Sequence, residues 1–195
     1  MKPPEDLITV LAEDHRELNQ LFTELEVLSG GEPLRRSLTD QMIIEAVRHA
    51  VAEEAYFYPV IRERLPDGDL IADGACGEHA HLEQIFKRLE RPDLPDDRFS
   101  LLLSWAIISA RRHIVDEEER IFPLLAMYVS PETLLSLGEK AKSAKAGAPG
   151  RGTPSEPQPP LLHTIIKGGI GLVERVRDHL CGPGRAYSLT SRDPE

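Results

Sequence analysis

The chain has 195 residues and a net charge of −10, and 41% of its residues are hydrophobic but only 5% aromatic. This length suits one globular domain with a short appendage, and its core needs no disulfide between the two cysteines. Residues 1–140 carry 15 basic against 28 acidic side chains. Such a charge repels phosphate backbones, so we expect no nucleic-acid partner. The longest apolar-rich run, residues 101–110, is too short to span a bilayer, and the acidic N-terminus is unlike a signal peptide. We therefore expect no membrane association and a cytoplasmic location.

Four periodic segments make up residues 1–130, and each places apolar side chains on one face of a helix. Clusters of Gly, Pro and acidic residues separate them at residues 29–33, 65–69 and 91–97. Apolar positions recur at steps of three and four residues, which is typical of an amphipathic helix, and no segment alternates like a strand. The stripe of the first segment consists of Ile8, Leu11, His15, Leu18, Phe22 and Leu25. We predict an all-α, up-down-up-down four-helix bundle over residues 1–130.

A helical extension and a tail are predicted beyond the bundle. An additional helix should cover residues 131–146, because Ser130 is a suitable N-cap and Pro131 suits the first helical position. Residues 147–160 contain five prolines and three glycines, which is typical of a stiff, solvated linker. Residues 161–195 form a mildly basic tail with a short helix over residues 172–180. Any protein partner is expected to bind through this tail.

Each predicted bundle helix carries one histidine within its apolar stripe: His15, His49, His79 and His113. Two of these have a glutamate four residues later, which gives the pairs His49–Glu53 and His113–Glu117. Four residues advance a helix by about 400° and about 6 Å, so the two side chains of each pair project from one face. That face points into the bundle, where an uncompensated carboxylate is very costly. A bound cation would compensate it.

Two simpler interpretations stay open at this stage. A single histidine on an apolar face is usually a hydrogen-bonded core residue, and a His–Glu pair four residues apart is usually a solvated ion pair. Four helices that each place a histidine on a buried stripe favour a metal site instead. Nitrogen and oxygen donors without thiolate suit iron, with manganese or zinc as alternatives. His81 is about 200° around the helix from His79 and should face solvent.

Longer motifs surround these residues, namely DHRELNQLF from residue 14, HAVAEEAYFYPVI from residue 49, EHAHLEQIF from residue 78 and HIVDEEERIFPLL from residue 113. Both H-x-x-x-E-E motifs are followed by an aromatic–proline pair. Together they resemble the hemerythrin-like HHE cation-binding domain family over about residues 5–128. The resemblance implies a four-helix bundle that holds two non-haem irons between its helices. By position, the implied metal ligands are His15, His49, Glu53, His79, His113 and Glu117, with the two glutamates bridging the metals.

Two positions differ from the oxygen-carrying members of that family. Those members have a second histidine one turn after the ligand of the third helix, where this chain has Glu83. They also place the last carboxylate five residues after its histidine, which leaves Glu118 as an alternative to Glu117. Both differences argue against reversible oxygen storage and match the broader bacterial members, whose roles include responses to oxygen, nitric oxide or peroxide and iron sensing. Glu54 is expected to point toward a neighbouring face and to be dispensable for metal binding.

Ligand counting indicates what such a site could do. Four imidazoles and two bridging carboxylates supply about eight bonds, whereas two six-coordinate ions need about twelve, which leaves about four positions open. We therefore predict a non-haem di-iron protein that binds or reduces a small oxidant such as O2, peroxide or NO. One alternative is an iron- or oxygen-responsive sensor that signals through a partner. The other is a purely structural bundle.

Overall fold

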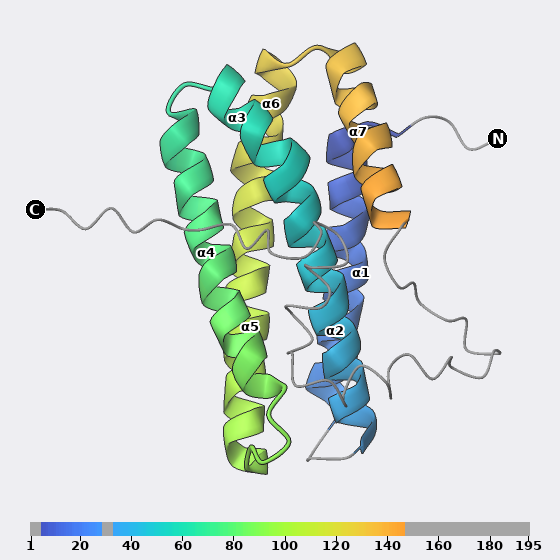
Figure 1. The fold of residues 1–195 in the computed structure, drawn as a ribbon, viewed down its shortest axis with the longest axis vertical. Helices are drawn as coiled ribbons and strands as arrows, with labels where there is room; N and C mark the ends of the chain where they lie inside the picture. The colour runs from blue at the N-terminus through green and yellow to red at the C-terminus, as the bar shows by residue number, and fades with distance from the viewer. Residues whose placement is uncertain (1–4, 29–32, 147–195) are drawn as a thin grey trace, which may run out of the picture.

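Helices make up nearly all of the residues that the computed structural model describes, which are 5–28 and 33–146, and no strand occurs among them. The helices from α1 to α6 form antiparallel rods along the long axis, and a shorter helix lies beside the first rod (Figure 1). The rods are α1 (Leu7–Val27), then α2 (Pro33–Ala52) with η1 (Glu53–Phe57) and α3 (Tyr58–Arg64), then α4 (Gly68–Leu89), and finally α5 (Asp96–Asp116) with η2 (Glu117–Ile121) and α6 (Phe122–Tyr128). The shorter helix is α7 (Pro131–Ala146). The predicted all-α bundle is confirmed.

A single π turn interrupts the second rod and another interrupts the fourth. The backbone N–H of Tyr58 donates to the carbonyl of Glu53, and that of Phe122 donates to the carbonyl of Glu117, in each case five residues back. A proline follows each of these aromatic residues. Inside a regular α-helix its ring would clash with the carbonyl four residues earlier, and the wider turn avoids that clash. Both π turns begin at the glutamate of an H-x-x-x-E pair, at the height of the predicted site.

The corner between α3 and α4 requires a specific backbone. Asp67 has a φ of 56°, in the left-handed region that few residues other than glycine adopt. Gly68 then begins α4 so close to the carbonyl of Ile61 that a Cβ atom would collide with it. This tight corner sets α4 directly against α3 and brings His79 to its place in the bundle.

Apolar side chains form two separate cores, one toward each end of the bundle. One core includes Phe22, Met42, Phe86 and Phe99, and the other includes Leu7, Leu11, Phe57, Ile61 and Leu125. Buried histidines and glutamates lie in the layer between them. The fold therefore supports this polar layer from both sides with packed apolar residues.

The helix α7 packs against α1 near the N-terminus of the bundle (Figure 1). Its Gly138 approaches the backbone of Glu5 so closely that a Cβ atom would collide there, and Lys142 forms an ion pair with Glu5. Among the described residues, no helix is long and apolar enough to cross a membrane. The predicted linker (147–160) and tail (161–195) lie outside the described residues, so the proposed division into domains stays a prediction.

Candidate metal centre

The structure brings all six predicted ligands together in the layer between the two cores. They come from α1, α2, η1, α4, α5 and η2, and every one of the six side chains is buried. Their donor atoms form two groups, within each of which the atoms lie within 4.8 Å of one another. The first group contains His15, His49, Glu53 and Glu117, and the second contains Glu53, His79 and His113.

Glu53 belongs to both groups because its two oxygens face different histidines. Its Oε1 lies 3.0 Å from Nε2 of His49, and its Oε2 lies 3.2 Å from Nε2 of His79. The side chain is fully buried. A carboxylate that faces two donor groups in this way can bridge two cations.

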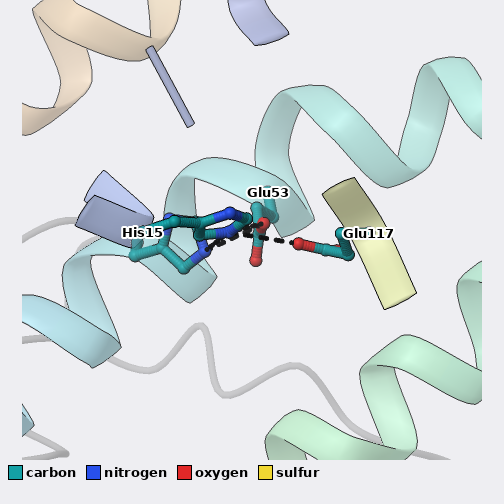
Figure 2. Close-up of side chains that lie close together, drawn as sticks. His15, Glu53 and Glu117 are labelled. Atoms are coloured by element: carbon teal, nitrogen blue, oxygen red, sulfur yellow. Dashed lines mark hydrogen bonds and ion pairs between the residues drawn. The ribbon is translucent and has the colours of Figure 1, made fainter. Parts of the chain in front are cut away.

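Glu117 connects the same two sides of the centre. Its Oε2 lies 3.4 Å from Nε2 of His15, and its Oε1 lies 3.5 Å from Nε2 of His113. Figure 2 shows Glu53 and Glu117 extending toward His15 from two different helical rods. The centre therefore has two buried carboxylates, each of which lies between two imidazoles.

The outer nitrogen of every site histidine contacts a carboxylate, and the four contacts form a ring around the bundle. For His49, His79 and His113, the carboxylate comes from the rod that precedes the histidine's own rod in the chain. For His15, on the first rod, it comes from η2 of the fourth rod, which completes the ring. Nδ1 of His49 lies 3.3 Å from Asp14, and Nδ1 of His79 lies 3.1 Å from Glu54. Nδ1 of His113 lies 2.8 Å from Glu78, and Nδ1 of His15 lies 2.9 Å from Glu118. A carboxylate at Nδ1 favours the tautomer with its proton there and directs the Nε2 lone pair into the centre.

These contacts bear on two expectations. Glu54 does point away from the inner cluster toward the neighbouring rod, where its carboxylate lies 3.1 Å from Nδ1 of His79. This contact with a site histidine argues against the expectation that Glu54 is dispensable for metal binding. Glu118 contacts the outer nitrogen of His15, so of the two adjacent glutamates Glu117 is the one inside the cluster. All four outer carboxylates are sequence neighbours of a predicted ligand, a signal that could have revealed them.

Tyr58 adds a hydroxyl to the centre that the sequence motif alone does not assign. It is buried, its O–H donates to Oε1 of Glu117 at 3.0 Å, and its oxygen lies 3.2 Å from Nε2 of His79. Burial raises the pKa of this phenol well above its ordinary value, and the nearby charges of Glu53 and Glu117 raise it further. Tyr58 is therefore a neutral hydrogen-bond donor. His81, by contrast, is exposed, as predicted.

The cluster attracts positive charge. Oε1 of Glu53 and Oε2 of Glu117 are buried and make no hydrogen bond within the described residues. Burial lowers the pKa of His49, but the charge of Glu53 and the hydrogen bond to Asp14 outweigh it and raise that pKa to about 10. Buried carboxylates need either protons on the imidazoles or a metal cation to compensate them. Unbonded oxygens beside inward-facing Nε2 atoms suit a metal cation.

Comparison with known protein families agrees with this geometry. The family described as hemerythrin HHE cation binding domain matches residues 6–125, a range that contains the whole cluster and its ring of outer carboxylates. The chain belongs to the hemerythrin HHE cation binding domain family. It is thus a hemerythrin-like domain with a buried histidine–glutamate cluster suited to metal binding.

Two individual proteins are similar to this chain. An uncharacterized hemerythrin-like protein from Schizosaccharomyces pombe is 24% identical over 166 residues, which cover 85% of this chain and 81% of that protein. The crystal structure of a hemerythrin HHE cation binding domain-containing protein from Mycobacterium kansasii matches with a TM-score of 0.64 at 20% identity. That match covers 73% of this chain and 86% of the mycobacterial chain, and it supports the fold.

Proposed function

We propose that this domain holds two non-haem iron ions between its helices and binds or reduces a small oxidant, such as O2, peroxide or NO. The observation that carries this proposal is that the two oxygens of Glu53 are divided between two histidine pairs. Two-metal sites in helical bundles are built from inward-facing carboxylates and histidines of this kind. The nitrogen and oxygen donors without thiolate favour iron, with manganese or zinc as alternatives.

The residues divide into an inner set, which would hold the ions, and an outer set, which orients the inner side chains. His15 and His49 would hold one ion, His79 and His113 the other, and Glu53 and Glu117 would serve both. Bound iron supplies redox chemistry and open coordination positions for a small ligand. The outer carboxylates keep the imidazole rings turned so that their Nε2 atoms face inward.

Two cavities adjoin the cluster and support access by small molecules. A cavity of about 30 Å³ is lined by Leu82, Phe86 and Ile114 together with three of the site histidines. This volume suits a molecule the size of water or a diatomic gas. A larger cavity of about 260 Å³ is lined by Glu117 at the centre and by exposed Arg120. Its lining mixes polar and apolar residues, and it borders the centre at Glu117 and His113.

Tyr58 supplies a neutral hydrogen-bond donor at this centre. Its raised pKa keeps the phenol protonated, and its single O–H donates to Glu117. When this hydroxyl turns away from Glu117, it can donate its hydrogen bond to an oxygen atom of a ligand held beside it. A hydrogen-bond donor that is preorganised in a buried centre favours the binding of an electron-rich oxidant.

The test is the reaction of full-length, iron-loaded protein with each oxidant. The protein is reduced without air and mixed with O2, hydrogen peroxide or NO in a stopped-flow instrument, and absorption and oxidant consumption are measured. We expect rapid spectral change with at least one of them, and a Glu53→Ala protein of low iron content gives the background. Iron-loaded protein that is unaffected by all three would contradict the proposal. One reaction per site without turnover would favour the sensor alternative, and the partner would then be sought through residues 147–195.

A further inference from the structure

The outer face of α5 carries an apolar stripe whose side chains are left 42–65% exposed by the other described residues. Among the described residues nine large apolar side chains are exposed, and four of them lie on this helix: Leu101, Trp105, Ile108 and Val115. Trp105 is 51% and Ile108 65% exposed. With Arg112, these residues recur at alternating steps of four and three, so they occupy a sector of about 80° of the helix. The opposite face of α5 is the one that contributes to the core and the metal centre.

A charged residue stands at each end of this α5 stripe, and the two charges are opposite. Arg98 lies one turn before Leu101, and Glu119 lies one turn after Val115, in η2. Both are exposed, and neither forms an ion pair with another described residue. Arg112, within the stripe, is bound to Glu78 through one nitrogen, and its side chain is still 78% exposed.

We propose that the α5 stripe is the interface of a homodimer in which two copies of α5 pack antiparallel. A twofold axis at the height of Ile108 brings together residues that are equally distant from it. Arg98 and Glu119 are ten and eleven residues away, and Trp105 and Arg112 are three and four. Arg98 then lies beside the partner's Glu119, and Trp105 stacks on the guanidinium of the partner's Arg112. Such a self-complementary face closes into a twofold dimer.

The charges favour the antiparallel orientation and a second copy of this chain as the partner. A parallel pair would place Arg98 beside the partner's Arg98 and Glu119 beside the partner's Glu119, which is unfavourable at both ends. From Leu101 to Val115 the stripe is about 21 Å long and it is one helix wide. That is a small interface, so we expect dissociation constants of the order of micromolar. The metal centre lies on the opposite face of α5, so its iron content should not depend on the dimer.

Sedimentation equilibrium of the full-length, metal-loaded protein tests the proposal. As concentration rises through the micromolar range, the mass should increase from the 21.8 kDa of one chain to twice that value. Trp105 is the chain's single tryptophan, so its emission should shift to the blue over the same range. Ile108→Glu should remain monomeric. Leu70→Glu, at an apolar residue of α4 that is at least as exposed as Ile108, is the matched control and should dimerise. Circular dichroism and iron content check that both variants fold.

Charge reversal tests the antiparallel register. Arg98→Glu and Glu119→Arg should each weaken the dimer about tenfold, because two ion pairs become two like-charge contacts. The double variant should restore wild-type affinity. A monomer at every concentration, a dimer that survives Ile108→Glu, or single variants without rescue would each overturn the proposal. A blue shift without a mass increase would overturn it too, because the stripe would then be covered by another segment of the same chain.

Discussion

Nδ1 of His15 lies 2.9 Å from Oε1 of Glu118, although 103 residues separate the two in the chain. This contact joins the first rod to the fourth and closes the ring of carboxylates around the four imidazoles. It restrains the His15 ring, which is also stacked on Phe122, and helps to hold its Nε2 atom toward Glu117. The orientation of the inner donors therefore depends on residues that do not themselves face the centre.

Removing an outer charge should weaken metal binding while the fold is kept. Glu118→Gln retains the shape of the side chain and an acceptor oxygen, but without the negative charge it stabilises the proton on Nδ1 of His15 less strongly. We expect metal affinity to fall about 10- to 100-fold, as when outer partners of metal ligands are changed. Glu54→Gln should behave in the same way toward His79. Competition with a chromogenic chelator measures the effect.

Glu119→Gln is the control for these two variants, because Glu119 lies in the same π turn as Glu118 and is exposed. Its metal affinity should equal that of the wild type. Equal affinities for Glu118→Gln and Glu119→Gln would show that the outer carboxylates do not position the ligands.

The inner glutamates should determine how much metal is bound. Either Glu53→Ala or Glu117→Ala removes a carboxylate that lies between two imidazoles, so the iron content after reconstitution should fall well below two per chain. His81→Ala, on the exposed side of α4, should leave the content unchanged. Elemental analysis by mass spectrometry measures all three. If Glu117→Ala keeps its iron and Glu118→Ala loses it, the two glutamates have exchanged the roles assigned to them.

Metal removal should destabilise the bundle. Without a cation, the carboxylates of Glu53 and Glu117 have to be compensated by protons on imidazoles that burial disfavours as charged groups. Differential scanning calorimetry before and after chelation should therefore show a clear fall in the thermal midpoint. A midpoint that does not change after verified removal of the metal argues against a buried site.

A separate acid should make stability depend on pH. Burial, together with the charge of Glu90, raises the pKa of Asp40 to about 6 from a usual 3.8. Because the folded-state pKa is the higher one, the protonated form favours folding, and its contribution is lost as pH rises from about 4 to 6. Asp40→Asn should abolish this loss and raise the free energy of unfolding at pH 7 by roughly 1–2 kcal/mol. Urea titrations at pH 4 and pH 7 measure it. Equal wild-type and variant stabilities at both pH values would contradict the assignment.

Periodicity located the inner residues but not their surroundings. His15, His49 and His113 fall on apolar stripes at helical spacing, so their convergence could be predicted from the bundle. The contact of Glu54 with His79 could not be predicted, because spacing along one helix does not show which polar atoms of the next rod lie within its reach. The contact of Asp14 with His49 depends on which rods are neighbours, and spacing along one helix contains no such information.

The same limit applies to Tyr58. The motif marks it as an aromatic residue before a proline, but a stripe of helical period cannot show whether a hydroxyl reaches another rod. The Tyr58 hydroxyl lies between Glu117 and His79 because η2 and α4, which carry those residues, pack close to the second rod. Sequence analysis therefore predicts which helices contribute to the centre better than it predicts how their polar atoms pair.

The central claim, that this bundle holds two irons, is tested most directly by the metal content of the purified full-length protein together with its absorption spectrum. We predict two iron ions per chain and a strong near-ultraviolet absorption from ferric iron in the oxidised protein. Protein that stays folded, contains no iron and takes up none on anaerobic reconstitution with ferrous salt would contradict the claim.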